Sequence, residues 1–228
     1  TLLVVNMRLI LLNCVDVYLF DVKTGKIIGE GPLKHSMEIA EISLNKQNLG
    51  NGRLLALVDK NRDLFLTKIA KLSLHKLGAI IEAFAWNDEN DLLVTIMDTK
   101  FVVWYYPTAI FIDEEVAPLA KHERDGSSFG RNVQITNFSG THCILRRADG
   151  ALVHVSNISP YAGMLQEFSK KKQWEQAIRL CRHIKIKELW AALAAMSLAN
   201  QDLNTAEVAY AAIDEVLIHF FLIFRFTK

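Results

Sequence analysis

The sequence predicts a partial β-propeller of WD-type blades over residues 1–158, followed by an α-solenoid of TPR-like helices over residues 159–228. Up to Val155, apolar residues recur at every second position and turns fall at Asp-Gly pairs, as in short antiparallel strands. After Pro160, apolar residues recur at intervals of three and four, as in amphipathic helices. The first part also repeats every 45 residues or so, which is about the length of a four-stranded blade.

The composition is that of a folded protein without a nucleic acid partner. Of the 228 residues, 51% are hydrophobic, so the chain can bury a sizeable core. Its 26 Lys and Arg are balanced by 25 Asp and Glu, and a net charge of +1 gives no general attraction for nucleic acid. The apolar start of the chain is interrupted by Asn6, Arg8 and Asn13. We therefore expect strand material there and no direct membrane insertion.

Four sets of short strands are expected in the first part. In residues 9–30, three strands are joined by an Asn/Asp turn and a Thr-Gly turn, and three later sets have a similar arrangement. Alignment of the third strands places Phe20, Leu66, Trp104 and His154 in one column, at spacings of 46, 38 and 50 residues. These spacings average about 45, the period of WD-type blades.

Four blades are few for a ring, because propellers usually close with roughly four to eight, and the first set lacks a clear opening strand. An open ring exposes hydrogen-bonding strand edges, which folded proteins avoid. We therefore expect the chain to be the carboxyl part of a longer protein, or another element to cover the edge. Residues 111–131 are polar and contain Pro118 and a Gly-Ser-Ser run, so a long surface loop is expected there.

Four helices are expected in the second part. Ser159 can cap the first helix, with Pro160 at its first position, and this helix is expected over residues 161–168. The second is expected at about 173–185. The third, residues 188–200, is apolar on nearly all sides, as expected of a helix that packs on both flanks.

The fourth helix is expected over residues 204–213, where Asn204 and Glu207 resemble a capping box. The apolar stretch 216–228 does not continue the pattern, and three readings stay open for it: a buried helix, a partner-facing patch, or a variant tail.

The second helix has two faces. At 100° per residue, its apolar side carries Trp174, Ala177, Ile178, Cys181 and Ile184, and its polar side carries Glu175, Gln176, Arg179, Arg182 and His183.

No motif for catalysis, cofactor binding or metal binding is found, so we expect a protein that is not an enzyme. The chain has no Gly-rich phosphate loop, nucleophile elbow or metal-binding His pair. Residues 113–115, Asp-Glu-Glu, are the best candidate for acid chemistry, and a propeller hydrolase using them is the alternative from another class. Cys14, Cys143 and Cys181 are too far apart for a zinc or disulfide framework and are expected to be idle thiols.

A partner-binding surface is expected on the second helix, at Trp174, Arg179, Arg182 and Lys185. The basic side chains on it can dock an acidic partner helix. A solvated helix face is the alternative for these cations, and a place in the core is the alternative for Trp174, as for the other tryptophans. The Arg179 and Arg182 pair is the set to test.

The junction resembles a known family. The strings RRADGALVHVS, SPYAGMLQEF and KQWEQAIRLCRHIK, together with MEIAEISLN, VDKNRDLFLTKI and DTKFVVWYYP upstream, are similar to the eighty-kilodalton WD-repeat subunits of intraflagellar transport complex B. The resemblance covers roughly residues 30–214 and departs after Ile213. It implies two propellers followed by a helical extension, with this chain holding the last blades of the second propeller and the first solenoid helices.

The resemblance also implies a function. We expect a non-catalytic scaffold in complex B that supports anterograde transport and cilium assembly. Its partners would be other complex B subunits, with a homodimer left open, and it would be found in the cilium, the ciliary basal body and the cytoplasm. The alternative is a vesicle-coat-like subunit in membrane trafficking, because such subunits share the plan of a propeller followed by a solenoid.

Overall fold

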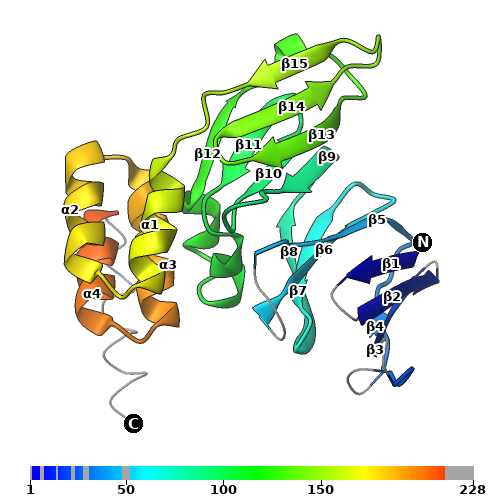
Figure 1. Ribbon diagram of the computed structural model, residues 1–228, viewed down its shortest axis with the longest axis horizontal. Helices are drawn as coiled ribbons and strands as arrows, with labels where there is room; N and C mark the ends of the chain where they lie inside the picture. The colour runs from blue at the N-terminus through cyan, green and yellow to red at the C-terminus, as the bar shows by residue number, and fades with distance from the viewer. Residues whose placement is uncertain are drawn as a thin grey trace. The chain divides into compact units, whose positions relative to one another are not determined.

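Four antiparallel sheets precede four helices in the computed structural model, which confirms the fold class expected from the sequence (Figure 1). The structure describes residues 2–5, 8–13, 15–21, 24–27, 31–47 and 52–213. Contacts divide the chain into two compact units, Thr1–Glu82 and Ala83–Lys228. In the described part of the chain, no helix combines the length and the apolar character that a membrane crossing needs.

The first unit contains two four-stranded sheets, each in sequence order. The first sheet is formed by β1 (Leu2–Val5), β2 (Arg8–Asn13), β3 (Asp16–Asp21) and β4 (Leu33–Lys34). The second is formed by β5 (Ile39–Leu44), β6 (Leu54–Asp59), β7 (Leu64–Lys68) and β8 (Lys71–Gly78).

The first repeat has the opening strand that the sequence left unclear. β1 pairs with β2 in an antiparallel register that runs from Leu2 opposite Leu11 to Val5 opposite Arg8. The expectation of only three strands in this repeat is therefore wrong. The last strand was also misplaced, because Ile27 makes only an isolated bridge to Phe20 and the fourth strand, β4, follows later in the chain.

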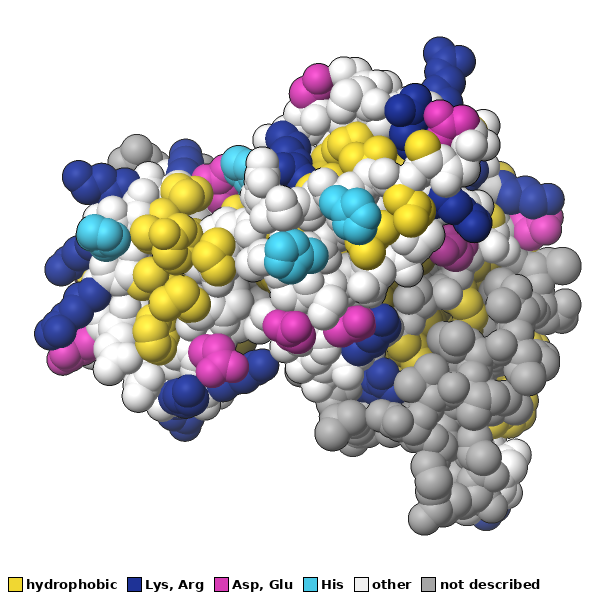
Figure 2. All heavy atoms as spheres, turned by 45° about the horizontal axis from the view of Figure 1, so that its top comes forward, with side chains coloured by type: hydrophobic (Ala, Val, Ile, Leu, Met, Phe, Trp, Pro, Cys, Tyr) yellow, Lys and Arg dark blue, Asp and Glu magenta, His cyan; other side chains and the backbone are white. Residues whose placement is uncertain are grey.

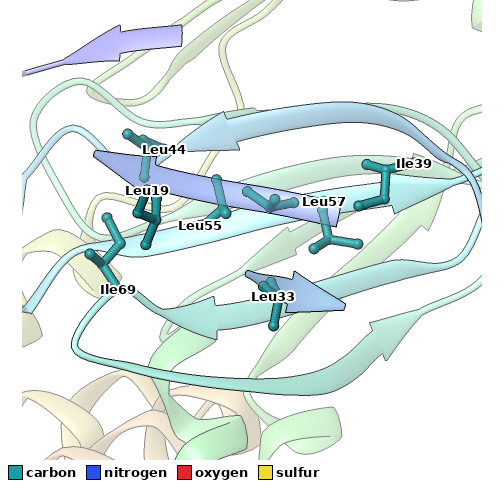
Figure 3. Packing of buried hydrophobic residues seen from close by; sticks show 8 residues of the cluster. Leu19, Leu33, Ile39, Leu44, Leu55, Leu57 and Ile69 are labelled. Carbon is teal, nitrogen blue, oxygen red and sulfur yellow. The ribbon is translucent and has the colours of Figure 1, made fainter. Parts of the chain in front are cut away.

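The core of the first unit lies between its two sheets. Figure 3 shows leucine and isoleucine side chains from both sheets pointing toward one another. Leu19 of β3 meets this cluster from one side, and Leu55 and Leu57 of β6 meet it from the other, all at most 1% exposed. Each such side chain contributes about 1.5–3 kcal/mol through its burial, so this layer supplies the main driving force for folding here.

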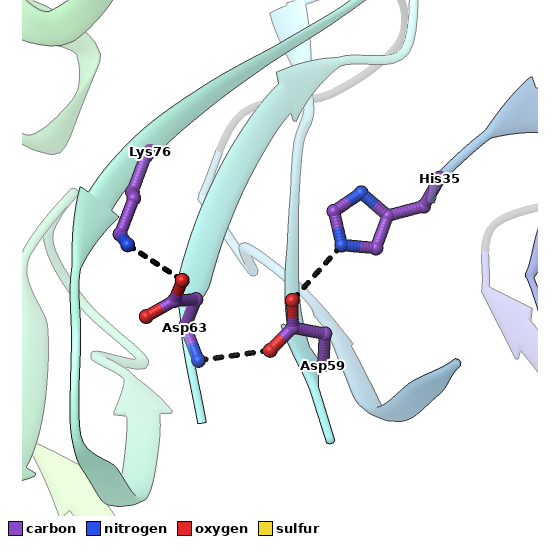
Figure 4. A network of polar contacts seen from close by, with 4 residues as sticks. All are labelled: His35, Asp59, Asp63 and Lys76. Atoms are coloured by element: carbon purple, nitrogen blue, oxygen red, sulfur yellow. Dashed lines mark hydrogen bonds and ion pairs between the residues drawn. The ribbon is translucent and has the colours of Figure 1, made fainter. Parts of the chain in front are cut away.

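A polar network, buried at His35 and Asp59, lies at the turn between β6 and β7. His35 Nε2 lies 3.0 Å from Asp59 Oδ2, and the backbone N–H of Asp63 donates to Asp59 Oδ1 at 3.0 Å (Figure 4). The side chains of His35 and Asp59 are only 7% and 2% exposed. Lys76 continues the network to Asp63 at 2.5 Å. The network fixes the turn between β6 and β7 and the chain that follows β4.

The second unit contains two further sheets and all the helices. β9 (Ile81–Trp86), β10 (Leu93–Met97), β11 (Lys100–Trp104) and β12 (Lys121–Asp125) form a four-stranded sheet. β13 (Gln134–Ser139), β14 (His142–Arg146) and β15 (Leu152–Val155) form a three-stranded one. The aligned column is confirmed, because its four residues lie in β3, β7, β11 and β15, the third strand of each sheet. In β11, Trp104 Nε1 donates to Thr95 Oγ1 at 3.3 Å, while His154 in β15 is exposed.

The expected surface loop at 111–131 is wrong. The segment contains β12, which pairs with β11 along its whole length, and the short 3₁₀ helices η3 (Ala117–Leu119) and η4 (Ser127–Phe129). Another 3₁₀ helix, η2 (Pro107–Phe111), precedes them. The strand was missed because its sequence, KHERD, is the outer edge of the sheet and carries no apolar alternation.

The four helices are α1 (Tyr161–Lys170), α2 (Trp174–Ile184), α3 (Lys187–Ala199) and α4 (Leu203–Ala212). Two cap assignments need correction. Pro160 occupies the cap position of α1 itself, and Ser159 Oγ accepts only a long hydrogen bond, 3.4 Å, from the N–H of Tyr161. The capping box at Asn204 is wrong, because Asp202 caps α4 by accepting from the N–H of Thr205 at 3.0 Å.

The division expected at residue 158 stays a prediction. The last strand ends at Val155 and the first helix begins at Tyr161, but the contacts place the helices in one unit with β9 to β15. Stretch 216–228 and Cys14 lie outside the described residues.

Candidate interaction surface and the joint that holds it

The outer face of α2 carries three of the four residues that the sequence singled out for partner binding, and the fourth, Trp174, lies on the apolar side of the helix. Arg179, Arg182 and Lys185 are exposed, and Trp174 is half-buried at the start of the helix. The structure thus brings the three cations together along the second half of a single helix. Ala177 and Cys181, on the opposite side, are fully buried, so the two-faced pattern of α2 is confirmed.

The cations of α2 belong to a wider basic region. Residues 170–187 contain seven Lys and Arg and one acidic residue, Glu175. The ion pair of Arg179 with Glu175, at 3.5 Å, joins side chains that are 77% and 88% exposed, so water screens it strongly. In Figure 2, a band of apolar side chains crosses the helical part and Lys and Arg side chains line its outer margin. An apolar band with a basic margin suits an amphipathic acidic partner.

Lys185 owes its position to the end of α2. Its backbone is left-handed, with φ 59°, and its N–H donates to the carbonyl of Cys181 at 2.9 Å. Glycine is the usual residue in this conformation, because it has no Cβ to clash there. Lys185 therefore ends the helix and does not extend it, one residue earlier than the sequence suggested.

Gln166 of α1 connects the helices to the sheet of β9 to β12. Its side chain is 3% exposed and makes three hydrogen bonds to backbone. Its Oε1 accepts from the N–H of Asp91 at 2.8 Å, and its Nε2 donates to the carbonyls of Asp91 at 3.0 Å and Tyr105 at 2.8 Å. One amide thus bonds to one donor and two acceptors of the buried backbone. These three hydrogen bonds, called the Gln166 joint below, orient α1, and α2 packs on α1.

Two further contacts fix the later helices. The hydroxyl of Tyr210 in α4 donates to Asp113 Oδ2 at 2.8 Å, and His122 Nδ1 of β12 lies 3.2 Å from Glu188 Oε1 of α3. Burial raises the pKa of Tyr210, and the Asp113 carboxylate raises it further. The phenol therefore stays protonated and remains a donor at any physiological pH. α3 also packs against η2 and η3.

Replacing Tyr210 with phenylalanine is expected to lower the free energy of unfolding of the second unit by about 1.5 kcal/mol, because a hydrogen bond to a charged acceptor is lost. Guanidinium unfolding followed by tryptophan fluorescence measures this, since all four tryptophans lie at or after residue 86. Tyr161 is half-buried, and its hydroxyl makes no hydrogen bond to the described residues, so Tyr161→Phe is the matched control. Equal effects of the two substitutions would contradict the role given to the Tyr210 hydroxyl.

The carboxylates at 113–115 have a structural role at Asp113. Its Oδ1 accepts from the N–H groups of Glu115 and Val116 at 2.9 and 3.3 Å, and its Oδ2 accepts from Tyr210. Both oxygens are thereby engaged in holding the turn and α4. Within the described ranges, no group of three or more His, Cys, Asp or Glu side chains is placed to hold a metal ion.

The two described cysteines are buried thiols. Cys143 and Cys181 are both free and have no exposed surface. Burial raises the pKa of each thiol to about 12. Neither forms a reactive thiolate at neutral pH, which agrees with the expectation for these two residues.

Sequence reasoning missed Gln166 and the His35 and Asp59 pair. Gln166 is a polar residue between Leu165 and Glu167 of a helix, and its own residue type predicts an exposed side chain. His35 stands 24 residues before Asp59, and the two could have been matched only through the blade repeat, as a histidine before the first strand and an aspartate at the end of the second strand.

Trp86, Trp104 and Trp190 are at most 8% exposed, as expected of core tryptophans. Trp174 differs from them, because it is only half-buried. It is therefore the one tryptophan among the four that a partner can contact.

Comparison with known proteins identifies the family of both parts. A family model described as IFT80 second beta-propeller matches residues 13–161, and that of the IFT80/172/WDR35/WDR19 TPR domain matches residues 189–222. Intraflagellar transport protein 80 homolog of Mus musculus is 45% identical over 205 residues, which are 88% of this chain and 26% of that protein. The Rattus norvegicus homolog is 44% identical with the same coverage.

The chain therefore spans about a quarter of the length of these curated relatives. Among solved structures, the computationally designed Ika8 protein is similar with a TM-score of 0.44 and 15% identity, over 69% of this chain and 46% of the designed one. The propeller match alone covers more than half of the residues, and the TPR match follows it in the order that the strands and helices have here. The chain belongs to the IFT80 family of intraflagellar transport proteins.

Proposed function

We propose that the protein is a non-catalytic scaffold subunit of intraflagellar transport complex B that supports anterograde transport and cilium assembly. The observation that carries this proposal is the 45% identity to an intraflagellar transport protein across both the strands and the helices. Sheets with loop-built faces and stacked helices can hold several proteins together without chemistry. We place the protein in the cilium, the basal body and the cytoplasm, with other complex B subunits as partners.

Within this function, we assign partner binding to α2. Trp174 offers a half-buried aromatic anchor at its start, and Arg179, Arg182 and Lys185 offer exposed charge from its middle to its end. Aromatic and arginine side chains are the residues that most often dominate binding energy at interfaces. The partner would be an acidic amphipathic helix that lays its apolar side along α2.

Charge reversal at Arg179 and Arg182 tests the surface. The double variant Arg179→Glu with Arg182→Glu is expected to weaken binding to purified complex B subunits about tenfold or more, because attraction becomes repulsion. The fold should not change, since both side chains are exposed. Arg131→Glu with Arg146→Glu, two exposed arginines outside the helices, changes the net charge equally and should bind as the unmodified chain does. Unchanged pull-down by the α2 variant would remove this surface from the proposal.

The location of the tagged full-length protein tests the function itself. In ciliated cells, we expect signal along the axoneme and at the basal body. Signal on Golgi or endosomal membranes would contradict the ciliary proposal and support a role in vesicle traffic. This result does not depend on the α2 surface, so the two tests can fail separately.

A further inference from the structure

A pocket lies in the second unit where the start of α1 meets two loops. Its volume is about 310 Å³. The loop between β9 and β10 supplies one wall, the turn between β13 and β14 a second, and α1 the third. This volume accommodates one long side chain of another protein. The pocket is separate from the outer face of α2.

Two glycines allow the walls to approach closely. A Cβ at Gly163 of α1 would lie 2.9 Å from Asn90 Nδ2, so a larger residue there would require the Asn90 side chain to move. Gly140 has φ +54°, and a Cβ on it would lie 3.1 Å from Glu89 Oε2. Positive φ and close contact both favour glycine at this turn. These close approaches, with the nearby Gln166 joint, give the pocket fixed walls.

The mouth of the pocket carries negative charge. Glu89 is exposed, its Oε1 accepts from the hydroxyl of Ser139 at 3.2 Å, and no cation of the described residues pairs with it. Glu167 of α1 lines the pocket as well, but Lys171 partly neutralises it at 3.2 Å. Glu89 is thus the carboxylate that lacks a positive partner.

Part of the pocket lining is apolar. Met164 of α1 lines the pocket and is 42% exposed, which is high for a methionine beside a folded core. Leu92 and Pro160 complete this side. Arginine and lysine combine an apolar stem with a charged end, and they bury the stem along apolar surface while the charge reaches a polar partner.

We propose that this pocket binds an arginine side chain from an exposed segment of a partner protein. The guanidinium would pair with Glu89, and the aliphatic stem would lie against Met164. Arginine fits better than lysine, because its planar end can donate two parallel hydrogen bonds to one carboxylate. The inference does not rest on the ciliary role of the protein.

Methyl NMR of the 228-residue chain, labelled with [13C-methyl]methionine, tests the proposal. The probe is the capped peptide acetyl-Gly-Arg-Gly-amide, and the control probe carries citrulline, a neutral analogue, in place of arginine. We expect the Met164 methyl signal to shift with millimolar half-saturation, as is usual for so small a ligand. The methyl group of Met37, an exposed methionine in the other unit, should not shift.

Charge variants complete the test. Glu89→Gln should weaken binding of the arginine peptide about fivefold, which corresponds to the loss of one charge-assisted bond of about 1 kcal/mol. Glu175→Gln, which removes a carboxylate from α2, should leave binding unchanged. Arginine and citrulline peptides that shift Met164 equally, a Met164 signal that does not respond, or Glu89→Gln binding as well as the unmodified chain would each overturn the proposal.

Discussion

Replacing Gln166 with alanine is expected to lower the free energy of unfolding of the second unit by about 3 kcal/mol, because each buried polar group left without a partner costs about 1–3 kcal/mol. The substitution removes three buried hydrogen bonds, which involve the N–H of Asp91 and the carbonyls of Asp91 and Tyr105. It also removes a side chain that is 3% exposed, so a cavity adds to the cost. The Gln166 joint is the sequence-distant contact whose loss we expect to matter most here.

Denaturant unfolding followed by tryptophan fluorescence measures the effect. The matched control is Gln176→Ala on α2, where the glutamine is exposed and makes no hydrogen bond to the described residues. We also expect faster hydrogen exchange at the Asp91 amide in the Gln166 variant alone. Gln166→Glu should be at least as harmful, because it replaces the NH₂ donor with an oxygen facing two carbonyls. A Gln166→Ala variant as stable as the Gln176 control would show that the joint contributes nothing.

Replacing Asp59 with alanine is expected to lower the free energy of unfolding of the first unit by about 3 kcal/mol. The second unit should not be affected. The carboxylate receives a hydrogen bond from His35 on one oxygen and from the Asp63 backbone on the other. Since a carboxylate only accepts, His35 Nε2 must carry the proton in this contact. Without Asp59, the imidazole N–H and the Asp63 amide lose their partner in a site where water has little access.

The first unit contains no tryptophan, so hydrogen exchange over β6 and β7 is the measurement for this variant. Asp63→Ala is the control, because it removes only an ion pair with Lys76 whose side chains are 50% and 21% exposed. That pair should contribute less than about 1 kcal/mol. Equal loss of protection in the two variants would contradict the importance of the buried Asp59 contact.

The hydrogen bonds of Asp59 predict that the stability of the first unit depends on pH. Burial alone would raise the pKa of Asp59, but hydrogen bonds from His35 and the Asp63 amide outweigh it, and the pKa lies below its usual value. A carboxyl whose pKa is lower in the folded state stabilises the fold fully above its unfolded pKa, and this contribution is lost as the pH falls through the folded pKa. Protection of β6 and β7 should therefore fall on acidification below about pH 4, and fall less steeply in Asp59→Asn.

Local patterns in the sequence predicted most of the fold. The four third strands, the change from strands to helices near residue 160, and the two faces of α2 all follow from apolar periodicity. Where one face of a strand or helix is buried, apolar residues recur in the sequence with the period of that strand or helix. β1 and β12 were missed for the opposite reason. β12 lies at the edge of its sheet and is largely polar, and β1 could not be separated from the apolar run that also contains β2.

The basic face of α2 could also be predicted from the sequence. Residues three or four positions apart lie on the same side of a helix, so the spacing of the charged and apolar residues indicates which side is exposed. Its position depends on contacts that sequence order does not reveal. Gln166 bonds to backbone groups 61 and 75 residues away, and Tyr210 to a carboxylate 97 residues away. A single glutamine or tyrosine carries no sign of such a partner in its own neighbourhood.

The sequence by itself determined most of the strands, the four helices and the buried side of α2, because these depend on the spacing of apolar residues over a few neighbouring positions. Only the tertiary structure decided the polar contacts that fix one element against another, and with them the pocket at the start of α1. Three segments meet there, and their meeting depends on how the sheets and helices pack. A buried hydrogen bond needs its partner within about 3 Å, and that placement is a property of the folded chain alone.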